Sequence, residues 1–349
     1  MHVLILHTGA VGDLVQALPA MAAVREVEPS ATVTFVGRPE RARLARAAGV
    51  CDACIDLETS GLWRVLSGDP CGPCPAWLAE ADLVLDFLTK GTFAERHGAG
   101  RRVVTVDPLP PNGYDRPAAV YVARQVREAL GLPPTNVDVR PVIPLDATAI
   151  AAGREALAAR GVRAPFVLVH PGSGSIRKNW PMGRFEALAR RLRDETGRAV
   201  AWLAGPAEQD RGTVPGGGET VLTDLSLVEV AAACALPEAY VGNDSGITQI
   251  AAAVRGVVPR ANGRLDAQPP LLSRRTKVDA DLTERQTTGD VPSPAQPRRE
   301  TPVVALFGPT DARVWAPRGE HVRLVQSPDG TVDAIDVETV WRAVQTALA

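Results

Sequence analysis

Residues 3–19, VLILHTGAVGDLVQALP, decide which fold is expected for this chain. An apolar run ends in a turn that contains two glycines and an acid, and the turn leads into a helical pattern. A buried strand followed by a glycine turn is typical of nucleotide-binding α/β folds, although their fingerprint G-x-G-x-x-G has a third glycine. The stretch therefore predicts an α/β fold and leaves open what the turn binds.

Pro19 determines where the helix after this turn is expected to begin. Proline costs about 3 kcal/mol inside a helix but is favoured at its first position. We therefore expect a helix over 19–28 and a loop over 8–17 that places Asp13 above the carboxyl end of the strand, where open α/β sheets bind ligands. Gly9 and Gly12 let this loop turn away from the strand. The alternative role for Asp13 is that of a turn or N-cap residue.

Length and composition narrow the class of protein. A chain of 349 residues predicts about two domains, and 45% hydrophobic with 22% charged residues is typical of a globular protein. The net charge of -2 argues against a nucleic-acid partner, because proteins that bind phosphate backbones are normally basic. The N-terminal sequence has no signal-peptide pattern, and no apolar stretch has the length of a membrane span. We expect a cytoplasmic protein and leave peripheral contact with a membrane open.

Strand-like and helix-like segments alternate along most of the chain, which predicts parallel sheets. Two such series indicate two doubly wound Rossmann-like domains, 1–150 and 151–349, joined between 135 and 165. The expected strands are 3–7, 32–37, 54–57, 82–87, 102–106, 166–170, 199–204, 220–222, 239–242 and 303–307. The expected helices, besides 19–28, are 39–48, 147–160, 181–196, 226–235 and 245–254.

Residues 256–301 interrupt the second series. They are rich in Pro, Arg, Thr and Asp and poor in large apolar residues, a composition that cannot form a core. We therefore expect a long disordered insertion. Asp279 and Asp281 within it match a metal-binding DxD pattern, which we interpret as a chance match in a charged segment.

Two turns in the second series carry groups that suit a phosphate. The turn over 170–179 follows the strand-like FVLVH and offers main-chain N–H groups, the Ser173 hydroxyl and the Lys178 ammonium. Lys178 is informative because the chain has only three lysines among 38 basic residues. The turn over 243–246, Asn-Asp-Ser-Gly, joins AYVG to a helix whose first N–H groups can bind an anion. A solvated turn and an ordinary capped helix start are the respective alternatives.

Four of the five cysteines form two Cys-x-x-Cys pairs, Cys51 with Cys54 and Cys71 with Cys74. Their spacing fits a structural zinc site, and Cys71-Gly-Pro-Cys74 alone also resembles a redox motif. No compact knuckle sequence surrounds either pair, and Cys54 leads directly into a strand-like segment. Unligated thiols are therefore the expected state, with structural zinc as the alternative.

The three turns resemble those of glycosyltransferase family 9, the ADP-heptose:lipopolysaccharide heptosyltransferases, as do 305–311 (ALFGPTD) and 315–317 (WAP). The resemblance covers nearly the whole chain outside 256–301. It implies a GT-B fold, in which two Rossmann-like domains face a central cleft. It also implies an inverting, metal-independent transfer of a heptose or a related sugar. The ADP-sugar donor is a substrate, so the resemblance implies that no cofactor is required.

The same resemblance implies roles for individual residues. Asp13 matches the family's general base, which takes the proton of the acceptor hydroxyl. The positions that match donor-binding residues of the family are Ser173, Lys178, Glu208, Leu225, Asp244, Ser245 and Gly246. Among these, Lys178 corresponds to the lysine that neutralises the diphosphate, and Glu208 and Leu225 fall where ribose and adenine are contacted.

Gln249 departs from the pattern, because many members of the family have a histidine at this position. A glutamine can hydrogen-bond a phosphate oxygen but cannot carry a positive charge, which bears on donor affinity and identity. The implied partners are a nucleotide-sugar donor and a lipid-linked or oligosaccharide acceptor, used by a monomer. The alternatives are a nucleotide-sugar-binding relative without transferase activity and a nicotinamide-dependent oxidoreductase. The latter needs a third glycine and an acid about twenty residues further on, which the chain lacks.

Overall fold

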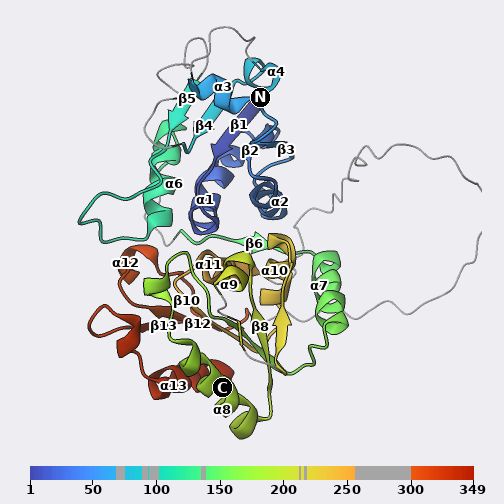
Figure 1. Ribbon diagram of the computed structural model, residues 1–349. Coiled ribbons are helices and arrows are strands. Elements are labelled where there is room, and N and C mark those ends of the chain that lie inside the picture. Colours follow the sequence, from blue (N-terminus) through green and yellow to red (C-terminus); the bar gives the residue numbers. More distant parts are fainter. Residues whose placement is uncertain are drawn as a thin grey trace, which may run out of the picture.

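The computed structural model describes residues 1–67, 75–88, 93, 102–134, 139–211, 214–215, 218–255 and 300–349. Within these residues the chain forms two α/β bodies, which lie one above the other in Figure 1. Cys71, Cys74 and nearly all of the expected insertion, Asp279 and Asp281 included, lie outside the described residues, so the expectations for them stay predictions.

The first domain contains a parallel sheet with the strand order β3-β2-β1-β4-β5. The strands are β1 (His2–His7), β2 (Thr32–Gly37), β3 (Ala53–Asp56), β4 (Leu83–Asp86) and β5 (Arg102–Thr105). The helices described in this domain are α1 (Val11–Val27), α2 (Pro39–Ala47), α3 (Leu62–Ser67), α4 (Ala76–Ala79) and α6 (Ala118–Ala129). Alternate strand residues face opposite sides, so α1, α2 and α6 pack on one face of the sheet and α3 and α4 on the other.

The second domain contains a parallel sheet with the strand order β13-β12-β10-β7-β8-β9. The strands are β7 (Phe166–His170), β8 (Ala199–Leu203), β9 (Thr220–Leu222), β10 (Ala239–Asn243), β12 (Val303–Phe307) and β13 (Val322–Gln326). The described helices are α7 (Ala147–Ala159), η1 (Ile176–Lys178), α8 (Met182–Thr196), α9 (Pro206–Asp210), α10 (Leu227–Cys234), α11 (Gly246–Ala253), α12 (Ala312–Trp315), η2 (Val332–Ala334) and α13 (Val337–Leu348). α8 and α13 cover one face of the sheet, and α10 and α11 cover the other.

Both sheets have the strand order of a Rossmann fold when the strands are numbered within each domain. In such sheets ligands bind at the carboxyl ends of the strands, at the position where the strand order reverses. That position lies between β1 and β4 in the first sheet and between β7 and β10 in the second. The turns after β1, β7 and β10 are therefore the natural ligand sites of this fold, and they are the turns that the sequence analysis selected.

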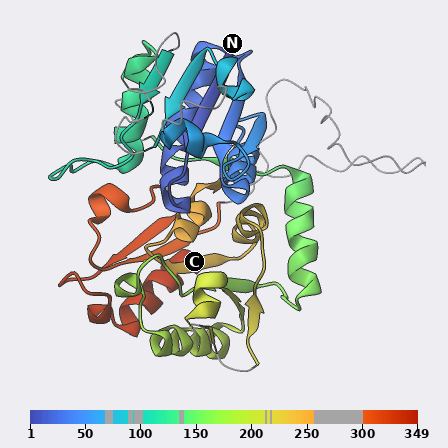
Figure 2. The ribbon, with the colours of Figure 1, turned by 45° about the horizontal axis from the view of Figure 1, so that its top comes forward.

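One of the apolar clusters contains residues of both domains. The cluster on the α1 face of the first sheet includes Ala231 and Ala232 from α10 and Ile250 and Ala253 from α11. α1 lies against α11, which is visible where the dark blue helix meets the lower domain in Figure 2. A short ladder between β6 (Ile143–Pro144) and β11 (Val254–Arg255) adds a main-chain connection. The position of Asp13 relative to the second domain is thus set by packed helices.

The prediction that the first helix begins near Pro19 is wrong. α1 begins at Val11, and Pro19 lies in its interior. Leu14, Val15 and Met21 of this helix are completely buried. Burial of one such side chain contributes about 1.5–3 kcal/mol, so together they outweigh the cost of an interior proline, about 3 kcal/mol. Asp13 therefore lies in the first turn of a helix and not in a loop over 8–17.

The remaining predicted elements are present, with ends that differ by at most one residue from the prediction. The α/β class is confirmed by the two parallel sheets. α6, β13 and α13 were not predicted, and β13 is mostly exposed, with Val325 as its buried residue. The domain boundary at 150/151 stays a prediction. No helix among the described residues has both the length and the hydrophobicity that crossing a membrane requires.

Candidate active site

The first turns of α1 and α11 touch across the boundary between the domains. A Cβ atom on Gly12 would lie 3.6 Å from Gly246 Cα, and a Cβ atom on Gly246 would lie 2.8 Å from Gly12 N. Only a residue without a side chain allows this approach at Gly246. The contact brings the Gly9–Asp13 turn of the first domain next to the Asp244–Gly246 turn of the second.

Asp13 occupies the first turn of α1 with one carboxylate oxygen engaged. Its Oδ2 atom accepts a hydrogen bond from Ala10 N at 2.9 Å, while Oδ1 makes no hydrogen bond within the described residues. Ala10 is the N-cap of α1, and Asp13 is the third residue of the helix, so Asp13 is not an N-cap, although one of its oxygens accepts from the main chain at the helix start. Asp13 interacts electrostatically with Arg41. Burial and the charge of Arg38 lower the pKa of the Arg41 guanidinium, and the Asp13 carboxylate partly offsets this lowering.

His7 lies beneath this turn and was not singled out from the sequence. A Cβ atom on Gly9 would lie 3.1 Å from both His7 Cε1 and Asp13 Oδ2, so a side chain here fits only if these two neighbours shift slightly. Burial, followed by the charge of Arg41, lowers the pKa of His7 to about 4. The imidazole is therefore uncharged at physiological pH. It supports the turn by packing beneath it.

Lys178 and Asp244 come together at the carboxyl ends of β7 and β10. Lys178 Nζ lies 2.7 Å from Asp244 Oδ2, with the lysine side chain one-third exposed and the aspartate buried. Ser173, in the same turn as Lys178, places its Oγ atom 2.7 Å from Ser175 O and 2.5 Å from Asn179 Oδ1. The two turns that were predicted to bind phosphate therefore meet through an ion pair, in which the Asp244 carboxylate holds the Lys178 ammonium group in place.

Asn243 joins these two turns and was missed as a functional residue. It is completely buried, its Nδ2 donates to Pro171 O at 2.7 Å, and its Oδ1 accepts from Trp180 N at 3.0 Å. Each end of the Lys178 turn is thus tied to the last residue of β10. The signal available in the sequence was its position, at the end of a buried strand and directly before Asp244.

Ser245 is the N-cap of α11, as the alternative interpretation of this turn predicted. Its Oγ accepts a hydrogen bond from Thr248 N at 3.2 Å, and Thr248 Oγ1 lies 3.1 Å from Tyr240 Oη. A cap leaves other N–H groups of the first turn without a helical partner. Those of Gly246 and Ile247 make no hydrogen bond within the described residues. The turn can therefore be a capped helix start and an anion site at once.

Glu208 is buried beneath the Lys178 turn. Its Oε2 accepts from Gly205 N at 2.8 Å, and a Cβ atom on Gly172 would overlap its Oε1 at 1.9 Å. Leu225 is half-buried against the apolar cluster on the α10 and α11 face of the second sheet. Both lie in the second domain as predicted, although whether they touch ribose and adenine stays a prediction.

Gln249 lies one turn further along α11 than Gly246 and faces the first domain, where it meets Gln16. Its Oε1 accepts from Gln16 Nε2 at 2.9 Å, and its Nε2 donates to Trp315 O at 2.7 Å. Both ends of its amide are therefore occupied by protein groups.

Cys51 and Cys54 are free thiols, the first buried and the second exposed. A hydrogen bond from Cys51, with help from Arg46 and Arg43, lowers the pKa of Cys54 to about 7, although partial burial opposes this. Within the residues that the structure describes, no three His, Cys, Asp or Glu side chains gather in a way that could hold a metal ion. The zinc alternative needs Cys71 and Cys74, which lie outside those residues.

Part of the chain is similar in sequence to a known family and to a curated protein. Residues 118–258 match the sequence pattern of glycosyltransferase family 9 (heptosyltransferase). Lipopolysaccharide heptosyltransferase 1 of Pseudomonas aeruginosa is 27% identical over 280 residues, which cover 73% of this chain and 76% of that protein.

Solved structures share the fold over almost the whole chain. A glycosyl transferase family 9 structure from Veillonella parvula superposes with a TM-score of 0.67 at 17% identity, covering 99% of this chain and 97% of that one. E. coli heptosyltransferase WaaC with ADP gives a TM-score of 0.63 at 17% identity, covering 99% and 100%. E. coli ADP-heptose lps heptosyltransferase II gives 0.67 at 16% identity, covering 100% and 98%. The predicted GT-B fold, with two Rossmann-like domains, is confirmed, and residues 118–258 are similar in sequence to glycosyltransferase family 9.

Proposed function

We propose that this chain moves a heptose, or a related sugar, from an ADP-sugar to a lipopolysaccharide-core-type or other glycan acceptor, with inversion and without a metal. The observation that carries the proposal is the contact between Gly12 and Gly246. It brings Asp13 of one domain beside the Lys178–Asp244 pair of the other. The similarity to a lipopolysaccharide heptosyltransferase and to a heptosyltransferase solved with ADP supports the choice of donor and acceptor class.

The donor diphosphate is assigned to the surface made by the turns after β7 and β10. Lys178 supplies a positive charge there, and Asp244 holds its ammonium group in position. The N–H groups of Gly246 and Ile247 add hydrogen-bond donors, while the Ser173 hydroxyl shapes the turn through its contacts with Ser175 O and Asn179 Oδ1. In the proposed complex Ser245 contacts the same group, while Glu208 and Leu225 contact ribose and adenine.

The proposed reaction is a single displacement at the anomeric carbon. The acceptor hydroxyl oxygen forms the new bond to that carbon while the bond from the carbon to the diphosphate oxygen breaks. Asp13 accepts the hydroxyl proton through Oδ1, since Oδ2 is held by Ala10 N. The charge that develops on the departing ADP is stabilised by Lys178 and by main-chain N–H groups, which act as fixed electrostatic partners and need no metal.

The proposal includes a setting for the reaction. We place the enzyme in the cytoplasm as a monomer, with peripheral contact to the membrane face that presents a lipid-linked acceptor. An oligosaccharide acceptor needs no such contact. Nucleic acid is not among the proposed partners, because the net charge is -2.

Replacement of Asp13 by Asn separates catalysis from donor binding. The amide keeps an oxygen for the hydrogen bond from Ala10 N but cannot accept the hydroxyl proton. We expect kcat to fall by about 10²–10⁴-fold, while the Kd for ADP changes by less than about threefold. Transfer from ADP-heptose and calorimetric titration with ADP measure the two quantities. A large loss of ADP affinity would instead place Asp13 in the donor site.

Replacement of Lys178 by Ala tests the donor site, and Arg177→Ala is its matched control. Arg177 precedes Lys178 in the same turn but is exposed to solvent. We expect Lys178→Ala to weaken ADP binding by about tenfold or more, because the diphosphate loses its cation, and Arg177→Ala to leave it unchanged. Titration of the wild type with ADP, GDP, UDP and NAD tests the donor class. Preference for NAD, or equal losses in the two variants, contradicts the proposal.

A further inference from the structure

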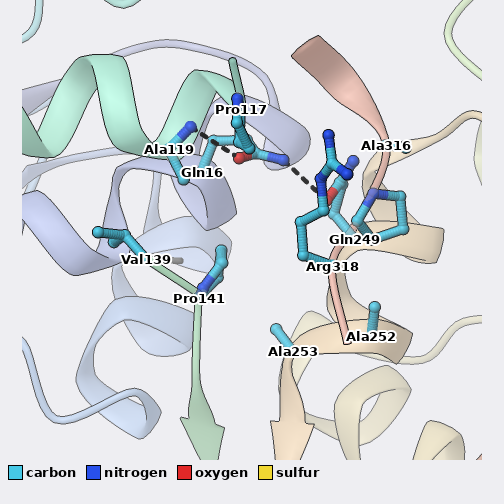
Figure 3. Close-up of a pocket in the computed structure, with 11 residues that line it drawn as sticks. Gln16, Pro117, Ala119, Val139, Pro141, Gln249, Ala252, Ala253, Ala316 and Arg318 are labelled. Atoms are coloured by element: carbon cyan, nitrogen blue, oxygen red, sulfur yellow. Dashed lines mark hydrogen bonds between the residues drawn. The ribbon is translucent and has the colours of Figure 1, made fainter. Parts of the chain in front are cut away.

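A chain of hydrogen bonds crosses the boundary between the domains one helical turn away from the proposed active site. Ala119 N donates to Gln16 Oε1 at 3.1 Å, and Gln16 Nε2 donates to Gln249 Oε1 at 2.9 Å. Gln249 Nε2 then donates to Trp315 O at 2.7 Å. Figure 3 shows the two amides pointing at each other from opposite domains.

The two ends of this chain fix the direction of both amides. Ala119 N–H can only donate and Trp315 C=O can only accept, so each glutamine has one orientation that satisfies its neighbours. Both end groups also need a partner. α6 begins after Pro117 without a side-chain cap, and Trp315 is the last residue of α12. Gln16 and Gln249 thus satisfy an N–H group at one helix start and a carbonyl at another helix end.

The hydrogen bonds lie in surroundings that make their loss costly. Gln16 and Gln249 are only 5% and 6% exposed. The pocket around them is lined by apolar residues, which include Val139, Ala252 and Ala253, and by Arg318. A buried amide without a partner is strongly unfavourable, so the pair is satisfied only when the two domains keep this one spacing and angle.

The position of the pair links this requirement to the reaction. Gln16 follows Asp13 by one turn on α1, and Gln249 follows Gly246 by one turn on α11. The two side chains therefore hold together the helices whose first turns carry the proposed base and the proposed diphosphate site. Any sliding of α1 along α11 that displaces Asp13 also breaks the bond between Gln16 and Gln249.

We propose that Gln16 and Gln249 are positioning residues, an interdomain pair that sets the distance between Asp13 and the donor diphosphate. This inference rests on the proposed function and deepens it. It also gives Gln249 a role different from the donor contact that the family resemblance implied: its amide holds the domains in place and does not bind phosphate.

The test uses Gln16→Met, Gln249→Met and the double variant, because methionine keeps the length of glutamine and removes its hydrogen bonds. We expect kcat to fall by about tenfold in each single variant and by little more in the double variant, since either change breaks the same bond. We expect the Kd for ADP to stay within about twofold of the wild type. Small-angle X-ray scattering is expected to show a wider distribution of domain separations in all three variants.

Gln125→Met is the matched control. Gln125 also bridges main-chain groups, with Oε1 accepting from Asp107 N and Nε2 donating to Asp107 O, but both partners lie in its own domain. We expect this variant to lower the melting temperature and to leave kcat and scattering unchanged. Weaker ADP binding in Gln249→Met would return Gln249 to the donor site and overturn the proposal, as would unchanged scattering. If the wild type transfers no sugar, the proposed function fails, while the scattering measurement still tests the pair.

Discussion

His7 makes the stability of the first domain depend on pH. Its ring packs beside Phe35 and Phe87, and its pKa falls from 6.5 to about 4 because the charged form would be buried. Between these values the unfolded chain binds a proton that the folded chain does not. Stability is therefore expected to decrease as the pH falls from about 6.5 to about 4, by up to about 3 kcal/mol.

Urea unfolding of the wild type and of His7→Gln over this pH range checks the expectation. Glutamine does not titrate, so the variant is expected to lose this part of the pH dependence even where its stability is lower throughout. His2→Gln serves as the control, since His2 lies half-exposed at the other end of the same strand. Equal pH dependence in the wild type and in His7→Gln would contradict the assignment of the titrating group.

At the scale of single elements, the glycines of the turn after β7 differ in what they tolerate. A Cβ atom on Gly172 would overlap the Glu208 carboxylate at 1.9 Å, whereas a Cβ atom on Gly174 meets nothing within 4 Å. We expect Gly172→Ala to destabilise the protein by about 1–3 kcal/mol, because Glu208 must give up its place under the turn. Gly174→Ala is expected to be neutral. Thermal unfolding of the two variants decides, and similar melting temperatures would contradict the packing described.

The elements themselves were predictable because their patterns are local. Every strand expected from an apolar run is present, and the helix starts at Ser226 and Ser245 follow from capping residues. The start of α1 was not predictable from Pro19 alone. The cost of an interior proline is a local quantity, while the burial that outweighs it comes from α6, α11 and the sheet, which are distant in sequence.

The residues of the candidate site also divide into those that a local motif indicates and those that depend on distant parts of the chain. Asp13, Lys178 and Asp244 were found because each follows a strand within a short motif. Asn243 and Gln16 were not selected, and Gln249 was selected only as a donor contact, since the partners of these amides lie far away along the chain. A buried amide has no sequence signature of its own, and only the assembled fold gives it a partner.

At the scale of the whole molecule, the contact between α1 and α11 predicts an asymmetry between two glycines. A Cβ atom on Gly246 would lie 2.8 Å from Gly12 N in the other domain, but one on Gly12 would make ordinary contact at 3.6 Å. Gly246→Ala is therefore expected to push the domains apart and to lower kcat by about tenfold or more. Gly12→Ala is expected to retain transfer close to the wild-type rate. Steady-state kinetics of both variants test this, and equal effects would argue against the domain arrangement.

Glu300 forms ion pairs with Arg255 and His321 in the second domain. Arg255 Nε lies 2.7 Å from Glu300 Oε1, and His321 Nδ1 lies 2.6 Å from Glu300 Oε2. The chain therefore departs at 255 and returns at 300 through side chains that are in contact. This contact makes the position suitable for domain insertion in protein engineering. A folded domain whose own ends lie close together is expected to replace 256–299 without displacing Arg255 or Glu300. A change in the number of residues between β11 and β12 is then expected to alter the length of the connecting chain and to leave the distance between the two strands unchanged.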